Sequence, residues 1–338
     1  MCWGYPSPIE SLSAARRLHK TDMNIVTVSP TRLGDTLFCT PAYRHIKQMR
    51  PQAHLTVIAM SVTARDVLRG NPYIDQLLFE PDEPQLGLLA PDLVLHLHHL
   101  AGAETYLEKL GCAPHRLGPQ NDALHCAEQT ARFVADVVGG VPDGAGYDLV
   151  PTAAEVERVD RLFQGISADA LLLGLHLGCH GLHKKRRSFW RRKTHAKAWP
   201  VARYVEFARL VRDSFHKQLD AQHRDVHFVV TGSGAERELA RDFCGNVPEA
   251  MDLTDQTSVG ELAALMSRLS MFVCGDTGPM HVACAADVPL LGLYGSTELH
   301  RTGPFPAAPQ RRVLKEVALH ELGADVVAAS AIEMLGQS

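Results

Sequence analysis

The stretch FVCGDTGPMHVACAADVPLLGLYGST, residues 272–297, decides the fold. An apolar run of strand length breaks into a turn at residues 275–279, continues as a helix of small residues, and ends in a second apolar run at 289–294. A strand, a helix and a strand in this order indicate parallel strands joined by a crossover helix. The turn also gathers an acid, a hydroxyl, two glycines and, just after it, a histidine, so it calls for a chemical explanation.

The same alternation runs through the rest of the chain and predicts an α/β protein with parallel sheets covered by helices on both faces. In the first half, apolar runs predict strands near 24–29, 54–59, 75–79 and 92–98, and helical periodicity predicts helices near 36–49, 61–69, 103–110 and 124–138. In the second half, the same signals predict strands near 171–177, 226–231, 271–274 and 289–294, with helices near 154–163, 201–215, 235–243, 258–268, 279–286 and 323–335.

Glycine and proline concentrate in residues 139–152, where we place a domain boundary. At 338 residues the chain is long enough for two domains of ordinary size. We expect Rossmann-like, doubly wound domains at 23–150 and 151–338, with the last helix packing back on the first domain. Residues 1–22 are expected to be a leader outside the core fold. Because such sheets bind ligands beyond the carboxyl ends of their strands, the main site is expected in a cleft between the domains.

The composition is that of an ordinary globular protein, with 46% hydrophobic and 21% charged residues. No stretch approaches the roughly 20 apolar residues that span a bilayer. The eight cysteines form no CxxC pair, which favours reduced thiols in a cytoplasmic protein. No nucleic-acid partner is expected. Three histidines, His96, His98 and His99, suggest either a metal site or polar residues where a strand ends near a cleft, and the absence of flanking cysteines or carboxylates favours the second interpretation.

Asp35 lies where the first strand gives way to the first helix, in the stretch Ser29-Pro30-Thr31-Arg32-Leu33-Gly34-Asp35-Thr36. It can act as a simple helix cap, since aspartate is favoured there. A carboxylate at the carboxyl edge of a sheet can instead point into the cleft and act as a general base. The flanking residues Thr31, Arg32 and Gly34 are then expected to bind the acceptor.

The turn from Asp276 to His281 is suited to an anion, because a helix start offers free N–H groups and the positive end of its dipole. Pro279 costs nothing near the first helical position, since its missing N–H would have no helical partner. Thr277 can donate its hydroxyl to a phosphate, Gly278 allows close approach, and Met280 lies in the first turn. Simple capping by Asp276 or Thr277 is the alternative. Asp276 would repel phosphate, so it is assigned to backbone N–H groups or ribose hydroxyls.

Two further stretches of the second half carry candidate donor contacts. Lys197, in Lys197-Ala198-Trp199-Pro200, precedes a predicted helix and can supply a point charge to a diphosphate. The Gly-rich turn that begins at Thr231 makes Gly232 and Glu236 candidates, the latter for ribose hydroxyls, although βα turns commonly use glycine. Upstream of Lys197 lies a run of basic residues without an acid: Lys184, Lys185, Arg186, Arg187, Arg191, Arg192 and Lys193.

These pieces together resemble glycosyltransferase family 9, the ADP-heptose:lipopolysaccharide heptosyltransferases. The resemblance rests on Leu33-Gly34-Asp35-Thr36-Leu37, on the Lys-x-Trp-Pro and Thr-Gly-Ser-Gly pieces, and on Gly275 to Ala283, in that order. It implies a GT-B fold, with the acceptor mainly on the first domain and the nucleotide sugar mainly on the second. It also implies an inverting transfer from ADP-heptose to lipopolysaccharide core, with Asp35 as base, Lys197 and residues 277–281 at the diphosphate, and no metal or other cofactor. The chain contains no Asp-x-Asp motif, the usual metal anchor of the other large glycosyltransferase class.

One segment departs from the family pattern. Before Lys197 the family usually has a shorter loop of small and hydroxyl residues, whereas this chain has the basic run, and Thr194 is the nearby candidate for a donor-side hydroxyl. The basic residues, among them Arg186, Arg187, Arg191 and Arg192, are expected to meet anionic groups of the acceptor or the inner membrane face, which makes peripheral membrane contact through 184–197 an expectation. A solvated loop is the alternative.

Other activities fit the same fold. A relative could transfer another sugar, or use a protein or another glycan as acceptor. Nucleotide-sugar 2-epimerases also use two Rossmann-like domains, and a non-catalytic nucleotide-sugar sensor is a third alternative. The presence of both Asp35 and Lys197 favours the transferase.

Overall fold

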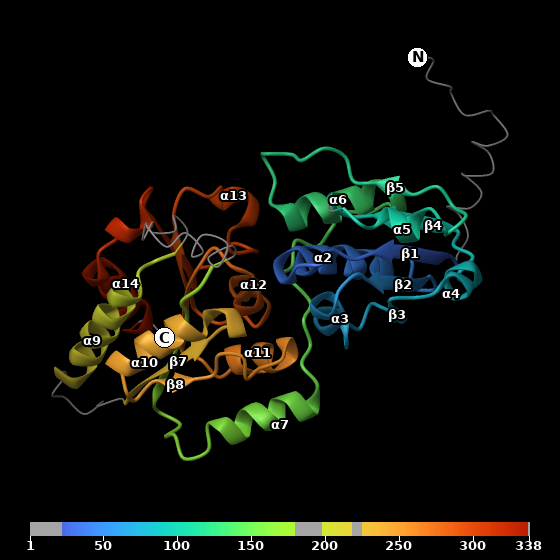
Figure 1. Cartoon of the computed structure of the whole chain (residues 1–338). Helices are drawn as coiled ribbons and strands as arrows, with labels where there is room; N and C mark the ends of the chain where they lie inside the picture. The colour runs from blue at the N-terminus through green and yellow to red at the C-terminus, as the bar shows by residue number, and fades with distance from the viewer. Residues whose placement is uncertain (1–21, 100, 180–197, 218–224, 337–338) are drawn as a thin grey trace, which may run out of the picture. The chain divides into compact units, whose positions relative to one another are not determined.

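The structure is a computed structural model that describes residues 22–99, 101–179, 198–217 and 225–336 (Figure 1). The chain divides into two compact units between Asp148 and Leu149, within the stretch rich in glycine and proline. The expected leader, residues 1–22, lies almost wholly outside the described residues.

The first unit is built around a parallel sheet with the strand order β3-β2-β1-β4-β5. Its described strands are β1 (Asn24–Val28), β2 (His54–Ala59), β3 (Gln76–Phe79), β4 (Leu93–His96) and β5 (His115–Arg116). The helices are α2 (Leu33–Met49), α3 (Val62–Leu68), α4 (Glu83–Leu88), α5 (Glu104–Leu107) and α6 (Cys126–Val138).

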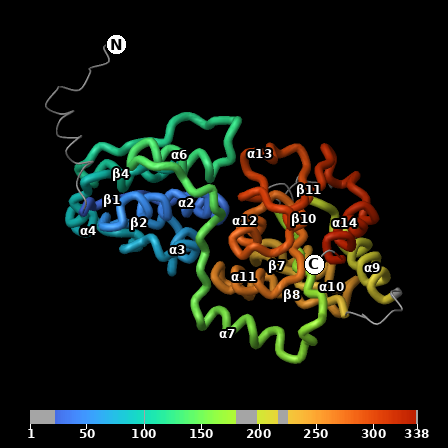
Figure 2. The backbone as a smooth tube through the Cα atoms, turned by 180° about the vertical axis from the view of Figure 1, so that it is seen from behind, coloured from blue at the N-terminus to red at the C-terminus, as the bar shows by residue number. Residues whose placement is uncertain are grey.

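Both faces of the first sheet are buried, as expected for parallel strands. On one face, Val28 of β1 and Val94 of β4 share an apolar cluster with Leu86 of α4 and Leu107 of α5. Ile25, which faces the other side because side chains alternate along a strand, is also fully buried. Helices α2 and α6 pack against each other. The unit is therefore a sheet with helices on both sides (Figure 2).

The second unit has the strand order β11-β10-β9-β6-β7-β8, again parallel. Its described strands are β6 (Leu171–His176), β7 (Val226–Thr231), β8 (Met251–Asp252), β9 (Met271–Gly275), β10 (Leu290–Tyr294) and β11 (Arg311–Lys315). The helices are α7 (Ala153–Leu162), α9 (Val201–Lys217), α10 (Arg237–Asn246), α11 (Val259–Met266), α12 (Gly278–Ala285), α13 (Leu299–Thr302) and α14 (Ala324–Gly336), with short 3-10 turns at Gly234–Glu236 and Leu319–Glu321.

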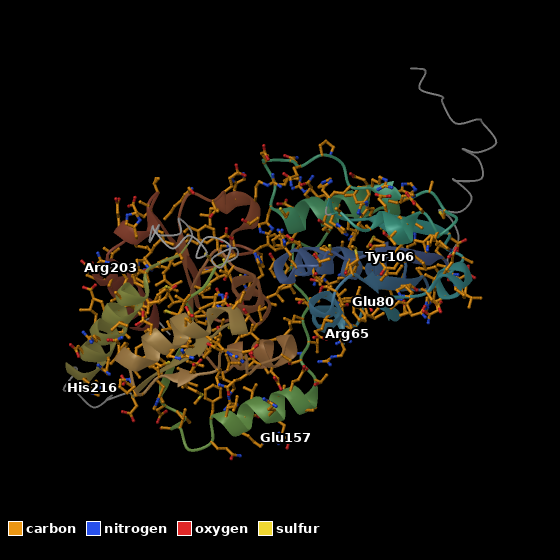
Figure 3. All side chains as sticks on the ribbon, viewed as in Figure 1. Arg65, Glu80, Tyr106, Glu157, Arg203 and His216 are labelled. Carbon is orange, nitrogen blue, oxygen red and sulfur yellow. The ribbon has the colours of Figure 1, made fainter. Side chains whose placement is uncertain are left out.

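One face of the second sheet is covered by α9, α10 and α14, whose apolar residues join those of the strands in a single cluster. Helices α11 and α12 pack against each other, α12 contacts β9 and β10, and α7 packs on α11. Charged side chains lie outside this core: Glu157 of α7 is 72% exposed and points away from its own unit (Figure 3).

The last helix packs within the second unit. Helix α14 lies against α9. Val327, Ala331 and Leu335 of its apolar face are buried in the cluster of that unit. The expected packing of this helix on the first domain stays a prediction.

The segment that ends the first unit is held by one buried arginine. Arg44 of α2 donates from Nε to Asp143 (2.9 Å) and from its terminal nitrogens to Asp148 and to the carbonyls of Ala145 (3.1 Å) and Gly146 (2.9 Å). Burial alone would lower the pKa of Arg44, but the hydrogen bonds and charges of the two aspartates raise it. A Gly- and Pro-rich stretch is thus ordered by a helix of its own unit.

Each sheet changes winding direction at its first strand. In the first unit, β1 lies between β2 and β4, and in the second unit β6 lies between β7 and β9. Loops that follow such central strands separate at the carboxyl edge, where doubly wound sheets bind ligands. In the first unit the β1–α2 loop leads to Asp35 in the first turn of α2, and in the second unit the β9–α12 turn holds residues 276 and 277.

Candidate active site

The β1–α2 loop, which leads into the helix that carries Asp35, is fixed by hydrogen bonds to the end of β2 and to the loop that follows it. The backbone N–H of Ser29 donates to Ile58 O (2.9 Å), its hydroxyl accepts from Met60 N (3.2 Å), and the Ser61 hydroxyl donates to Thr31 O (2.8 Å). The loop therefore enters α2 from a rigid position at the carboxyl edge.

Asp35 lies in the first turn of α2 and is half-buried. The capping position itself belongs to Arg32, whose side chain makes no capping hydrogen bond, while Thr36 donates its hydroxyl to the Arg32 carbonyl at 2.8 Å. Asp35 is therefore not the cap residue, and the positive end of the helix dipole stabilises its ionised form. Of the predicted acceptor residues, Arg32 is exposed, and Thr31 and Gly34 are half-buried around Asp35.

In the second unit, the turn after β9 has the geometry of an anion site. Thr277 is the capping residue of α12, with φ −146° and ψ 162°, yet its side chain does not cap the helix. Its hydroxyl makes a long contact of 3.4 Å to Gly275 O. The helix begins at Gly278, one residue before the predicted start, and Pro279 sits at its second position. The simple capping interpretation is thus wrong for Thr277, and the first N–H groups of the helix lack helical partners.

The remaining residues of this turn are placed by the core beneath it. Met280 and His281 are buried, and Asp276 is half-buried. The hydroxyl of Tyr294, at the end of β10, lies 3.0 Å from Met280 Sδ and 3.1 Å from Thr302 O, and it can donate its one proton to either acceptor. Burial, followed by the charge of Asp276, raises the pKa of Tyr294, so it stays a neutral donor under the turn. Sequence reasoning missed Tyr294, and its position at the end of an apolar strand was the available signal.

Glu236 stabilises the start of the 3-10 turn that follows β7. Its Oε2 accepts from the backbone N–H of Ser233 (2.8 Å) and from the Ser233 hydroxyl (2.5 Å), which completes a capping box. It lies against Gly178, where an added Cβ would come within 2.3 Å of Glu236 Cγ. Glu236 thus supports the end of β6, while contacts of Gly232 and Glu236 with ribose stay predictions.

Lys197, Thr194 and the arginines Arg186, Arg187, Arg191 and Arg192 lie outside the described residues. The described residues resume at Ala198, and the next residue, Trp199, is held by hydrogen bonding and packing. Trp199 is buried, donates from Nε1 to Leu322 O (2.9 Å), and meets the ring of Tyr204 edge-on at 4.7 Å. Tyr204 in turn donates to His176 O at 3.2 Å, where β6 ends. The start of α9 is therefore tied to the carboxyl edge of the second sheet, two residues after Lys197.

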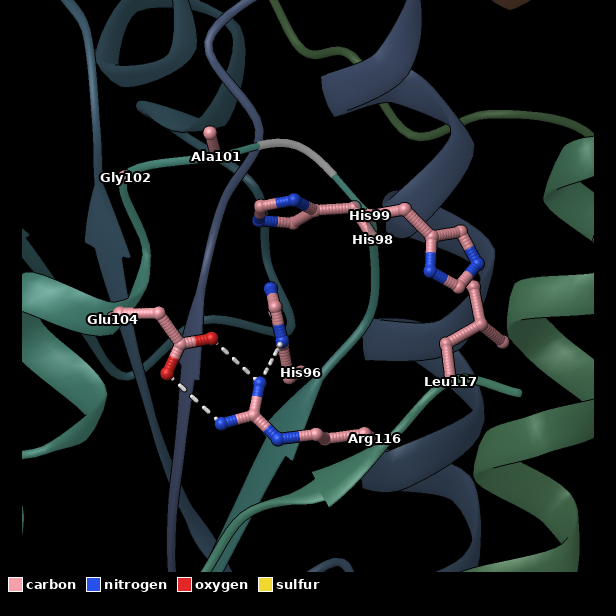
Figure 4. Close-up of a pocket in the computed structure, with 8 residues that line it drawn as sticks. All are labelled: His96, His98, His99, Ala101, Gly102, Glu104, Arg116 and Leu117. Carbon is pink, nitrogen blue, oxygen red and sulfur yellow. Dashed lines mark hydrogen bonds and ion pairs between the residues drawn. The ribbon is translucent and has the colours of Figure 1, made fainter. Parts of the chain in front are cut away.

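The three histidines after β4 line a pocket in the first unit (Figure 4). This agrees with their interpretation as polar residues at a strand end. Across the described ranges, no group of three or more histidine, cysteine or acidic side chains is arranged to hold a metal ion. No helix in these ranges is long and apolar enough to cross a membrane.

Comparison with known proteins places this geometry in context. Residues 190–324 match the model of glycosyltransferase family 9 (heptosyltransferase). Lipooligosaccharide heptosyltransferase 2 of Haemophilus influenzae is 31% identical over 111 residues, 32% of this chain and 30% of that protein. Lipopolysaccharide heptosyltransferase 3 of Escherichia coli K12 is 34% identical over 106 residues, 29% of this chain and 30% of that protein. The chain thus aligns with under a third of the length of these curated relatives.

The fold comparison extends over nearly the whole chain. A glycosyltransferase family 9 protein from Veillonella parvula superimposes with a TM-score of 0.77 at 19% identity, covering 93% of this chain and 97% of that one. The ADP-heptose lipopolysaccharide heptosyltransferase II of E. coli gives 0.72 at 18% identity, with 93% and 99% covered. The fold is GT-B, as the sequence resemblance implied. The chain is thus similar to glycosyltransferase family 9 in sequence over residues 190–324, and it shares the fold of these solved structures.

Proposed function

We propose that this protein is an inverting glycosyltransferase that moves heptose from ADP-heptose to a hydroxyl of lipopolysaccharide core without a metal ion. The observation that carries the proposal is the family match over residues 190–324, which includes the uncapped turn at the start of α12. The similar curated proteins are named lipooligosaccharide and lipopolysaccharide heptosyltransferases, which supports heptose as the sugar and this class of acceptor.

The leaving group is the ADP diphosphate, on which negative charge grows as the sugar departs. The Thr277 hydroxyl, not used as a cap, and the free N–H groups of α12 would donate to it. Lys197 would add a positive charge next to the anchored start of α9. Preorganised donors of this kind each lower a barrier by a few kcal/mol. Asp276 would hold backbone N–H groups or ribose hydroxyls rather than phosphate, and His281 would lie near the phosphates.

Asp35 would act on the acceptor side. Its carboxylate lies in the first turn of α2 at the carboxyl edge of the first sheet, after a loop held by hydrogen bonds of Ser29 and Ser61. There it would accept the proton of the acceptor hydroxyl as that oxygen attacks the anomeric carbon, a role worth about 10²–10⁴ in rate. Base and leaving-group contacts thus come from different units of the chain.

The basic run before Lys197 would meet anionic groups of the acceptor or of the inner membrane face. Its eight cationic residues, Lys197 included, sit in a chain whose net charge is −4, so the rest of the chain carries about −12. Replacing Arg186, Arg187, Arg191 and Arg192 by glutamine should raise the KM for acceptor and flatten its dependence on salt. Acceptor kinetics that stay the same at every salt concentration would rule this role out.

The test of the proposed function is to incubate the purified protein with ADP-heptose and a series of truncated lipopolysaccharide acceptors, in buffer containing EDTA. Mass spectrometry should show one added heptose on one acceptor of the series, with ADP released in equal amount. Reactions without enzyme and with ADP-glucose are the controls. Epimerised nucleotide sugar without transfer, transfer from ADP-glucose alone, or activity that EDTA abolishes would contradict the proposal.

A further inference from the structure

A pocket of about 290 Å³ opens at the carboxyl edge of the first sheet, where β4 and β5 end. We refer to it as the His96 pocket. Its lining side chains include His96, His98, His99, Glu104, Arg116 and Leu117 (Figure 4). This volume lies at the lower end of the range for small-molecule sites, about 300–1,000 Å³, so it suits a single sugar ring rather than an oligosaccharide.

Hydrogen bonding fixes the tautomer of His96. Arg116 Nη1 lies 3.0 Å from His96 Nδ1, and a guanidinium can only donate, so Nδ1 is the acceptor. In the neutral ring the proton is then on Nε2. Burial and the nearby charge of Arg116 lower the pKa of His96, which favours this neutral form. The ring therefore presents one N–H donor at Nε2.

That donor has no partner among the residues that the structure describes. His96 is 7% exposed, and its Nε2 atom is fully buried without a hydrogen bond. Figure 4 shows His96 and Arg116 in the lining of the pocket, and the ring of His98 meets that of His96 nearly at right angles, with centroids 4.7 Å apart. An unpaired buried N–H costs about 1–3 kcal/mol, so a ligand oxygen that accepts this hydrogen bond would recover that cost.

The charge of the pocket is close to zero. Arg116 donates to both carboxylate oxygens of Glu104, at 2.7 and 2.9 Å, and this pairing lowers the pKa of Glu104. His98 donates from Nε2 to Val28 O at 3.1 Å, and burial lowers its pKa to about 4, so it too is neutral. A phosphate or a sugar acid would meet a carboxylate already paired with the arginine, whereas sugar hydroxyls can both donate to Glu104 and accept from His96.

The pocket lies in the same unit as Asp35 and on an adjacent strand end. Strands β1 and β4 are neighbours, and the His98–Val28 hydrogen bond joins the end of β4 to the last residue of β1. The loop that leads into α2, and so to Asp35 in its first turn, begins at the next residue, Ser29. A sugar in the His96 pocket therefore belongs to the acceptor side of the reaction.

We infer that the His96 pocket is an acceptor subsite that binds an uncharged sugar ring through its hydroxyls, with His96 Nε2 as donor and Glu104 as acceptor. The assignment of this sugar to the acceptor rests on the proposed function. Binding of a sugar in the pocket can be tested without the donor and without transfer. The inference separates two roles: neutral sugar recognition in the first unit, and anion recognition by the basic run.

Histidine-selective ¹⁵N labelling allows a direct test on the full chain. The ring nitrogens of His96 are followed during titration with methyl glucoside, methyl glucuronoside and inorganic phosphate. Methyl glucoside should shift the Nε2 signal saturably, and the two anions should shift it less at equal concentration. The exposed His54 is the internal control and should not respond, because it begins β2 at the amino edge of the sheet, whereas the pocket lies at the carboxyl edge. Glucoside affinity, followed by the ligand's own NMR signals, should fall about 2- to 10-fold in His96→Gln, the loss expected for one hydrogen bond.

A second variant avoids changing a buried residue. Glu104→Gln leaves Arg116 uncompensated at the rim, so it should bind phosphate and glucuronoside more tightly and glucoside more weakly. Glu128→Gln, which removes another exposed carboxylate paired with an arginine in the same unit, is the matched control and should bind all three probes as the unchanged chain does.

The outcomes separate this inference from the proposed function, because heptose transfer and ADP binding are measured on the same preparation. Transfer without any response of His96 to methyl glucoside would overturn the subsite alone. Preference for phosphate or glucuronoside in the unchanged chain, or a Glu104→Gln variant with unaltered preference, would overturn it as well. If His96 responds saturably to methyl glucoside but the protein transfers no heptose, the sugar site is supported and the proposed function is contradicted.

Discussion

Thr277 and Thr152 hold the same position at two helix starts but do different things. Thr152 forms a capping box with Glu155, accepting from its backbone N–H at 3.3 Å, whereas the Thr277 side chain caps nothing. The Thr277 hydroxyl instead makes the long contact of 3.4 Å to Gly275 O. The two threonines therefore allow a stability role and the proposed binding role to be compared within one unit.

Thr277→Val should weaken ADP binding roughly 10-fold or more, since hydrogen bonds to charged groups are worth about 1.5–3 kcal/mol. The free energy of unfolding should change little. Thr152→Val should do the reverse, losing about 1 kcal/mol of stability with normal ADP affinity. Calorimetric titration with ADP and urea unfolding of both variants check this. Equal ADP affinity in Thr277→Val and the unchanged chain would show that the Thr277 hydroxyl does not bind the donor.

His98 links stability to pH. Its pKa falls to about 4 on folding because burial disfavours the charged ring. The unfolded chain therefore binds a proton that the folded chain does not, from about pH 6.5 down to pH 4. As the pH falls through that window, protonation of this histidine in the unfolded chain should lower the free energy of unfolding by about 1.4 kcal/mol per pH unit. Above it the effect is absent.

The measurement is urea unfolding between pH 7.5 and 5. His98→Gln should lose part of the pH dependence, while His54→Gln, which changes an exposed histidine, should retain it. His96 and His176 are shifted in the same direction, so the remaining slope stays positive with rising pH. Identical slopes in His98→Gln and the unchanged chain would contradict the assignment.

At the scale of elements, Trp199 fixes the start of α9. Its indole N–H donates to Leu322 O, so the chain just before α14 and the chain just before α9 are held together. Trp199→Phe should leave that buried carbonyl unpaired and lower the free energy of unfolding by about 1–3 kcal/mol. It should also raise the KM for donor, because Lys197 precedes this anchor by two residues.

Urea unfolding and donor kinetics check the Trp199 prediction. The matched control is Trp3→Phe, in the expected leader, which should change neither quantity. A Trp199→Phe protein of reduced stability but unchanged donor KM would show that the anchor serves folding alone.

The longer apolar strands were predictable from sequence, including the edge strand β3, whereas the two-residue strands and the charged strand β11 were not. Strands β1, β2, β6 and β7 are long apolar runs, and they begin at the predicted residues. Strands β5 and β8 have two residues each, too few for a periodic signal, and β11 is the edge strand Arg-Arg-Val-Leu-Lys, whose charges mask it. Sequence analysis placed the three histidines of the His96 pocket near a cleft but missed its other polar residues for the same reason, since Arg116 lies on β5 and its partner Glu104 on the four-residue helix α5.

At the scale of the whole molecule, the two units share one plan. Each is a parallel sheet whose winding direction changes at its first strand, and each carries a candidate site residue near that point. The alternation of strands and helices predicted parallel sheets covered by helices. Packing of the last helix on the first domain stays a prediction, because an apolar helix face does not say which surface it covers.

The division of labour between units is the central claim, and Asp35→Asn tests it most directly. Transfer of heptose from ADP-heptose to a lipopolysaccharide-core acceptor should fall about 10²- to 10⁴-fold, since the acceptor hydroxyl loses its base. Affinity for ADP should stay unchanged, because the donor turn belongs to the other unit, and Asp136→Asn, an exposed carboxylate on α6, should keep full transfer. Full transfer by Asp35→Asn, or loss of transfer and ADP binding together, would contradict the account.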